Sequence, residues 1–354
     1  MGLLFLQLSK EFYKVADKVY NRQFEIDKRL ESEYNEYRRT KMYEDILYNL
    51  SFLDIAKRYD DYQLFDNYSL WLLSLMNHLM PDLGIDRIKE QMITHYQLLK
   101  EALFEILEAE EYNLYMILLD RAIEKTQSAV EPQKIDRLGI GKFGAIRKTY
   151  LNLLLKSDAS GAMKYISEVA SMGFSLEEIF VDVLQEVMKE IGELWHQAII
   201  TVDQEHYMTS MTQVVMSQFY PQIFGSKRKG VKLLSCTVGS ELHEMGARMV
   251  SDLFENNGWD GIYLGAALPT KQILNGISHH QPDLIALSVT MPHHLPECQK
   301  VVEAIRKEYP NLLIAVGGRA FQVTNNIWKN WPVDTYAADA KEFLAWAETH
   351  VGKN

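Results

Sequence analysis

Residues that could do chemistry gather around one histidine in the second half of the chain. Glu241 and His243 stand two positions apart, with Leu242 between them and Gly246 three positions further on. A neutral imidazole is a common ligand of transition metals, and a ligating histidine usually donates its other ring N–H to a carboxylate. The residue types of His243 and Glu241 suit this chemistry, but the pair alone does not assign it.

Two further segments follow this histidine. Between Gly246 and the segment Ser288-Val289-Thr290 lie 41 residues, and between Thr290 and the pair Gly317-Gly318 lie 26. Each segment alone is common, because a Gly-Gly pair often forms a turn and a lone loop histidine is usually a surface residue. Their combination at these intervals is specific.

The elements around these segments predict how they meet. We expect strands at 231–238, 261–265, 284–289, 312–316 and 335–337, alternating with helices that end near 258 and span 270–279, 295–307 and 341–350. Alternating strands and helices predict an α/β, doubly wound parallel sheet of the Rossmann-like or flavodoxin-like kind. Ligands of such sheets bind at the carboxyl ends of the strands, where all three segments fall.

A second group of residues lies upstream, in a region predicted to be helical. Trp195 and His196 end one expected helix, while Val202, Glu205 and His206 begin the next. A tight turn would bring an aromatic ring, two imidazoles and a carboxylate to one rim, where they could cap a large planar cofactor. Each has an ordinary alternative: a core tryptophan, a carboxylate at a helix N-terminus, or a solvated histidine.

Capping patterns delimit these helices. Ser175 with Glu178, and Thr201 with Gln204, fit capping boxes, so we expect one helix from 175 to about 198 and another directly after it. Three domains are predicted: an all-α region at 1–130, a helical bundle at 134–224 and the α/β domain at 230–354, with a break near 130–133.

The C-terminal region resembles the cobalamin-binding domain shared by methionine synthase, corrinoid methyl-transfer proteins and B12 photoreceptors. That family's pattern is Asp/Glu-x-His-x-x-Gly, then Ser-x-Val/Leu/Thr, then Gly-Gly. The resemblance implies that His243 replaces the cofactor's own dimethylbenzimidazole below cobalt. It also implies a deep slot for the displaced nucleotide tail, in which Ser288 can hydrogen-bond and Gly317 and Gly318 allow close approach. Gly246 would let the loop turn under the corrin ring.

Trp195 followed after nine residues by Glu205-His206 resembles the signature of CarH-type adenosylcobalamin photoreceptors. The resemblance covers residues from about 138 to 354 and implies that Trp195 packs over the adenosyl group, that Glu205 contacts it, and that His206 helps to form the pocket. His196 matches the residue that takes the upper cobalt position after light expels the adenosyl group. Residues 1–130 do not resemble the MerR-type DNA-binding domain of that family.

The sequence therefore predicts a cobalamin-binding, light-responsive regulatory protein, for example in transcription, and not an enzyme. Adenosylcobalamin is the expected cofactor, with hydroxo- or methylcobalamin as alternatives. Two other functions stay open: a corrinoid carrier for methyl transfer, and a light-independent cobalamin-sensing adaptor of the antirepressor kind. We expect a homo-oligomer and a protein partner that binds through residues 1–130, which could instead serve dimerisation or sensing.

Composition excludes several classes. The net charge is −11, and residues 1–130 carry 16 Lys and Arg against 23 Asp and Glu, which disfavours direct DNA binding. The two cysteines, Cys236 and Cys298, lie far apart, which indicates a reducing cytoplasm. The first six residues are apolar but short and lack a basic segment, so we expect no signal peptide, and no stretch is long enough for a membrane span. No nucleophile triad, phosphate-binding loop or zinc cluster is present in the sequence.

Overall fold

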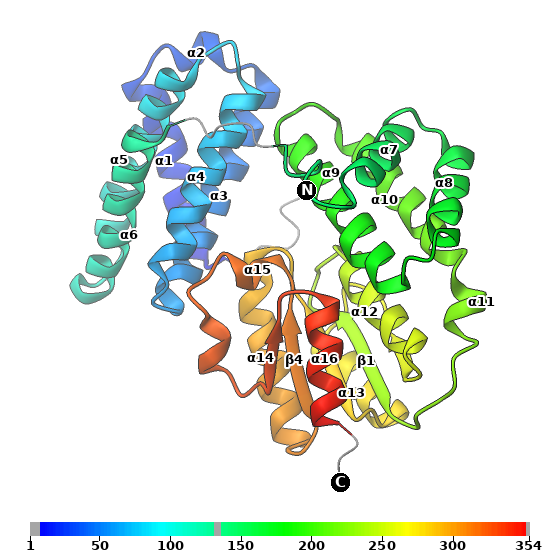
Figure 1. The fold of residues 1–354 in the computed structure, drawn as a ribbon. Helices are drawn as coiled ribbons and strands as arrows, with labels where there is room; N and C mark the ends of the chain where they lie inside the picture. The colour runs from blue at the N-terminus through cyan, green and yellow to red at the C-terminus, as the bar shows by residue number, and fades with distance from the viewer. Residues whose placement is uncertain (1–7, 131–135, 352–354) are drawn as a thin grey trace. The chain divides into compact units, whose positions relative to one another are not determined.

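The computed structural model describes residues 8–130 and 136–351 (Figure 1). The expected break near 130–133 and the expected absence of a signal peptide concern residues that lie largely outside these ranges. The chain forms two compact units, one made of Met1–Pro132 with Val323–Ile327, and the other of Gln133–Gln322 with Trp328–Asn354.

The first unit is helical, as the sequence predicts. Side-chain caps at Ser9, Asn35 and Asp61 accept hydrogen bonds from the first turns of three of its helices, which fixes where they begin. Leu47, Leu53 and other apolar residues of these helices are fully buried. The helices are α1 (Lys10–Ile26), α2 (Leu30–Glu33), α3 (Glu36–Arg58), α4 (Tyr62–Leu79), α5 (Ile85–Phe104) and α6 (Ala109–Ser128).

The second unit begins with a helical bundle in which both expected capping boxes are present. The amide of Glu178 donates to Ser175 Oγ (3.2 Å) and that of Ser175 to Glu178 Oε2 (3.0 Å), while Thr201 and Gln204 form the second box. The bundle consists of α7 (Gly144–Leu155), α8 (Ala159–Ser171), η2 (Glu178–Gln185), α9 (Glu186–His196), α10 (Val202–Ser217) and α11 (Tyr220–Ile223).

The helix expected at 175–198 differs in two ways. Its first part, η2, is a π-helix of eight residues. The spacing of apolar residues over so short a segment does not distinguish a π-helix from an α-helix. It ends at His196 because Ala198 adopts a left-handed backbone conformation (φ 53°), which an α-helix does not accommodate.

The sheet domain follows and has the expected doubly wound topology. Its five parallel strands lie in the order β2-β1-β3-β4-β5. β2 is added on one side of β1, and β3 to β5 are added on the other side, so the strand order reverses between β1 and β3. Thr237 pairs with Ser288, and Ser288 with Gly317, so the three central strands end level with one another. The strands are β1 (Lys232–Thr237), β2 (Asp260–Tyr263), β3 (Leu284–Ser288), β4 (Leu313–Gly317) and β5 (Thr335–Ala337).

Helices cover both faces of this sheet. Phe254 of α12 (Met245–Asn256) contacts Phe343 of α16 (Ala340–His350) on one face. α13 (Thr270–His280) and α14 (Leu295–Glu308) pack together, and right-handed crossovers place them on the other face. Two shorter helices, η3 (Pro292–His294) and α15 (Arg319–Gln322), follow the ends of β3 and β4, and η4 (Ile327–Asn330) lies between α15 and β5. Strand and helix limits differ from the expected ones by one or two residues.

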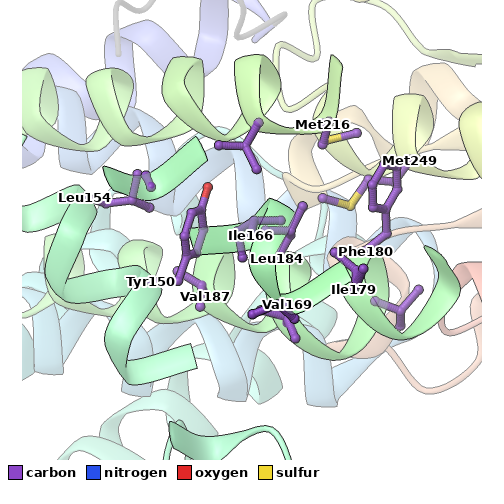
Figure 2. Packing of buried hydrophobic residues seen from close by; sticks show 14 of the residues in the cluster. Tyr150, Leu154, Ile166, Val169, Ile179, Phe180, Leu184, Val187, Met216 and Met249 are labelled. Atoms are coloured by element: carbon purple, nitrogen blue, oxygen red, sulfur yellow. The ribbon is translucent and has the colours of Figure 1, made fainter. Parts of the chain in front are cut away.

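The bundle and the sheet domain share one hydrophobic core. Met249 and Leu253 of α12 and Ala340 of α16 belong to the same buried cluster as Phe180 and Leu184 of the bundle; Figure 2 shows Met249 beside Phe180 and Met216. Polar contacts surround this core, since Asn257 donates to Glu177 (2.8 Å) and Lys341 pairs with Asp182 (2.6 Å). None of the described helices combines the length and apolar character needed to cross a bilayer.

Candidate functional site

Glu241 and His243 form a tight pair in the loop after β1. His243 Nδ1 lies 2.5 Å from Glu241 Oε1, and the backbone N–H of His243 donates to the same oxygen (3.0 Å). The imidazole therefore presents its Nε2 away from the carboxylate, and no hydrogen bond to this atom is found among residues 8–130 and 136–351. A histidine held in this way has one ring nitrogen fixed as the donor and the other available as a ligand.

Glu241 also joins two strand ends. Its Oε2 accepts hydrogen bonds from the backbone N–H groups of Thr290 (2.9 Å) and Met291 (2.8 Å), directly after β3. The side chain is only 1% exposed. Burial raises the pKa of Glu241, but the hydrogen bond and charge of His243, with the backbone donors, outweigh it and lower the pKa to about 2. The buried carboxylate thus stays ionised and fixes the loop that carries His243.

The His243 side chain remains 41% exposed despite these contacts. Burial lowers its pKa, but the hydrogen bond and charge of Glu241 outweigh this and the pKa is raised overall; Glu205 adds to the rise and Arg319 opposes it. Glu205 belongs to the bundle helix α10, so this charge effect connects the bundle with the loop that carries His243. Arg319 was not predicted, although its place directly after Gly317-Gly318 was a signal for it.

The glycines at the end of β4 have a reason within the protein itself. Gly318 has φ 101°, and a Cβ added there would meet Val289 O at 2.3 Å; one added at Gly317 would meet Ala337 O at 3.1 Å. Close packing of β4 against its neighbours thus requires small residues, whether or not a ligand approaches them. Ser288 and Thr290, at the same edge, are half-buried.

Gly246 does not form the turn that we expected. It lies in the first turn of α12 and its φ is not positive, so the loop's change of direction comes earlier, between Thr237 and Glu244. A Cβ added at Gly246 would meet nothing within 4 Å. The space beside it is open to a ligand on that side.

Exposed apolar side chains occur next to His243 in the chain and, separately, at the α9–α10 turn of the bundle. Leu242, between Glu241 and His243, is 64% exposed, and Ile199 and Val202 at the α9–α10 turn are also exposed. Large apolar side chains left in water are typical of a surface that a ligand or a partner covers. The sequence contains no signal for Ile199, because it lies in the five-residue connection between α9 and α10, outside any motif.

The predicted upper residues differ in their surroundings. Trp195 is half-buried against the bundle core, and His196 is buried at the end of α9. Glu205 accepts a hydrogen bond from Thr209 Oγ1 (2.9 Å), and His206 Nε2 lies 3.4 Å from its other oxygen. His206 is exposed. The structure thus brings Glu205 and His206 together, while His196 lies inside the bundle.

Glu244, next to His243, links the loop to the bundle. One of its oxygens accepts from Gln213 Nε2 of α10 (2.9 Å) and the other from Tyr263 OH of β2 (2.7 Å). Arg248 donates to Tyr220 OH of α11 (2.7 Å) and lies over the ring of Tyr263. The loop that carries His243 is therefore tied directly to α10, whose first turn contains Glu205.

His293 and His294 follow β3 and lie near the same loop. Burial lowers the pKa of His293 to about 4, with the neighbouring His294 adding to the effect, and burial also lowers the pKa of His294. Both are therefore neutral at physiological pH and do not compete with His243 for the charge of Glu241. Within the described ranges, no group of three His, Cys, Asp or Glu side chains is arranged to hold a metal ion by itself.

Comparisons with known proteins show what two regions of the chain are similar to. The family described as B12 binding domain matches residues 231–340, and a second family with the same description matches residues 146–220. The HTH-type transcriptional repressor CarH of Myxococcus xanthus is 27% identical over 143 residues, which are 40% of this chain and 47% of CarH, so this chain spans about half of that relative. Dimethylamine corrinoid protein 1 of Methanosarcina acetivorans is 26% identical over 169 residues, 46% of this chain and 76% of that protein.

A solved structure shows the same fold. The monomethylamine corrinoid protein of Methanosarcina barkeri superposes with a TM-score of 0.51 at 18% identity, covering 58% of this chain and 98% of its own. The cobalamin-binding resemblance and the fold predicted from the sequence are confirmed by these matches. The chain is a protein with B12-binding domains, over residues 146–220 and 231–340.

Proposed function

We propose that this protein is a light-responsive regulator that binds adenosylcobalamin with His243 as the lower axial ligand of cobalt. The observation that carries the proposal is the half-exposed His243 imidazole, whose Nδ1 is fixed by the buried Glu241 carboxylate at the β1–β3 reversal of the sheet. Ligands of doubly wound sheets bind at that reversal.

The residues present fit a corrinoid. A corrin ring supplies four nitrogens to cobalt, so the protein needs to contribute one axial ligand and not a cluster. His243 is such a ligand, and the exposed Leu242, Val202 and Ile199 give apolar surface for the two faces of a large ring. Val289, Ser288 and the glycines at the end of β4 lie where the resemblance places the nucleotide tail.

Above the ring, we propose that Trp195 packs against the upper ligand, that Glu205 contacts it, and that His206 completes the pocket. When bound, adenosylcobalamin supplies a cobalt–carbon bond that light breaks. His196 is the proposed upper ligand after that event. Since its side chain is buried in the bundle, this role requires the end of α9 to move.

The response would spread through the contacts between bundle and sheet. Glu244 ties the His243 loop to α10, and the shared core around Met249 connects α12 to the bundle. We propose that loss of the upper group changes this interface and, through it, the assembly or partner binding of the chain. The N-terminal unit is the proposed partner-binding or dimerisation element, and its acidic charge favours a protein partner over DNA. The buried free thiols Cys236 and Cys298 agree with a cytoplasmic location.

A corrinoid carrier for methyl transfer is the second candidate. It is favoured by the match to dimethylamine corrinoid protein 1, which this chain covers to 76%. Such a carrier would share His243 and Glu241 but would bind methylcobalamin at least as well as adenosylcobalamin. Equal affinity for the two forms, together with no change in mass on illumination, would favour it over the light sensor.

The test uses the full chain reconstituted in darkness with adenosylcobalamin. Wild type should bind with an absorption spectrum of histidine-ligated cobalamin, and illumination should change both the spectrum and the molecular mass. His243→Ala should bind at least tenfold more weakly, since one metal-ligand bond is lost. The matched control, His279→Ala on the exposed face of α13, should behave as wild type. If wild type stays colourless after incubation, cobalamin binding is refuted; if it binds but light alters neither spectrum nor mass, the light response is refuted.

A further inference from the structure

Arg319 is an exposed cation at the edge of the sheet that carries His243. The sheet domain has three arginines, of which Arg248 donates to Tyr220 and Arg306 to Asp334. Arg319 is exposed, and in the part of the chain that the structure describes its guanidinium has no hydrogen bond or ion pair. Its charge is therefore available to a ligand.

The backbone of Arg319 is fixed relative to His243 by a short series of contacts. Gly318 packs on Val289, the N–H of Ala320 donates to Val289 O (3.1 Å), and the N–H of Val289 donates to Gly317 O (3.0 Å). The two residues that follow Val289 donate to the Glu241 carboxylate, which holds His243. The backbone from which the Arg319 side chain extends is therefore connected by these contacts to the loop that carries His243.

The register of the sheet supports this placement. Thr237, Ser288 and Gly317 pair with one another at the ends of β1, β3 and β4, so the segments that carry His243 and Arg319 leave the sheet at the same edge. An anion bound by Arg319 would therefore lie at the edge of the sheet that carries His243.

Cobalamin carries one anionic group of this kind. Its corrin ring bears neutral amide side chains, while its nucleotide tail contains a phosphodiester. When a histidine replaces the tail's base on cobalt, the tail extends on the histidine side of the ring. We propose that Arg319 binds this phosphodiester and makes the chain selective for corrinoids with a nucleotide tail over those without one. The proposal rests on the proposed function and assigns a specificity residue to it.

The expected strength follows from guanidinium chemistry. A guanidinium donates two parallel N–H groups to a pair of phosphate oxygens, which a lysine cannot reproduce. Because Arg319 is exposed, salt screens the interaction, so its loss should weaken cobalamin binding roughly tenfold at low salt and less at high salt.

The experiment titrates the full chain with hydroxocobalamin and with hydroxocobinamide, which lacks the nucleotide and its phosphate, and follows absorbance. The variants are Arg319→Gln and Arg319→Lys. The matched control is Lys307→Gln, which removes an exposed cation in the last turn of α14, at the opposite edge of the sheet. Arg319→Gln should lose affinity for cobalamin and keep that for cobinamide, Arg319→Lys should be intermediate, and Lys307→Gln should match wild type.

The outcomes separate the inference from the function beneath it. Unchanged cobalamin affinity in Arg319→Gln, or an equal loss for both corrinoids, overturns the role of Arg319 while cobalamin binding stands. Failure of wild type to bind either corrinoid overturns the proposed function itself. A loss restricted to cobalamin that shrinks as salt rises supports phosphate recognition.

Discussion

Replacing Glu241 by glutamine should weaken both the protein and its site. The carboxylate accepts four N–H groups, from the backbone and ring of His243 on one oxygen and from Thr290 and Met291 on the other. A glutamine has one carbonyl oxygen and one NH2 group. In either orientation, two of the four donors therefore face another donor.

The magnitude follows from these contacts. A hydrogen bond to a charged acceptor contributes about 1.5–3 kcal/mol, so losing two costs at least about 3 kcal/mol when the site is as buried as Glu241. The imidazole also loses the partner that sets its tautomer, and loss of such a partner typically lowers metal affinity by about 10- to 100-fold. Both effects are expected at pH 7, where the wild-type carboxylate, with its pKa lowered to about 2, is ionised.

Two measurements test this. Hydrogen exchange followed by mass spectrometry should show faster exchange at Thr290 and Met291 in ligand-free Glu241→Gln, and cobalamin titration should show the loss of affinity. Glu303→Gln, on the exposed face of α14, is the control. If Glu241→Gln exchanges and binds like the control, the carboxylate neither anchors the β3 end nor orients His243, and the account of the site fails.

Two stability predictions follow from the surroundings of Asp252 and of Gly318. Burial, with a smaller contribution from Glu255 against the opposing charge of Arg248, raises the pKa of Asp252 from 3.8 to about 7. The folded state thus binds the proton more tightly, so this group's stabilisation is complete below pH 4 and is lost as the pH rises to 7. Asp252→Asn should therefore gain up to about 4 kcal/mol relative to wild type between pH 4 and pH 8 in urea unfolding, and a pH-independent difference would contradict this. Gly318→Ala should lose about 3 kcal/mol or more, because its Cβ meets Val289 O and its φ is positive, whereas Gly192→Ala, with open space in α9, should gain about 0.5–1 kcal/mol; equal melting temperatures would refute the packing argument.

The sequence alone was sufficient for the fold of the second unit. Strands such as 284–289 are short apolar runs between turn residues, and the helices between them are bounded by caps such as Thr201 with Gln204, so local patterns determine the order of elements. Because all strands of such a sheet run parallel, their ends meet at one edge. Glu241, Ser288 and Gly317 could therefore be predicted to converge without a structure.

What the sequence could not provide depends on contacts between distant residues. The reach of Glu241 to Met291, 50 positions away, has no local signature. The exposure of Arg319 and its proximity to His243 depend on how β4 packs against β3. We expected Gly246 to form a turn, and this was wrong, because Gly246 lies inside α12. A glycine after a strand is as compatible with a helix start as with a turn.

The shared core around Met249 has a practical consequence for anyone dividing this chain. Leu253 and Ala340 pack in a core that they share with bundle residues. A fragment that starts at residue 230 would therefore expose these apolar side chains of α12 and α16 to solvent. Such a fragment would tend to aggregate, and the bundle alone would lose the α12 and α16 side chains that complete its core. The bundle and the sheet domain should unfold together in one cooperative transition. Residues 136–351 are therefore the shortest fragment that keeps this core intact.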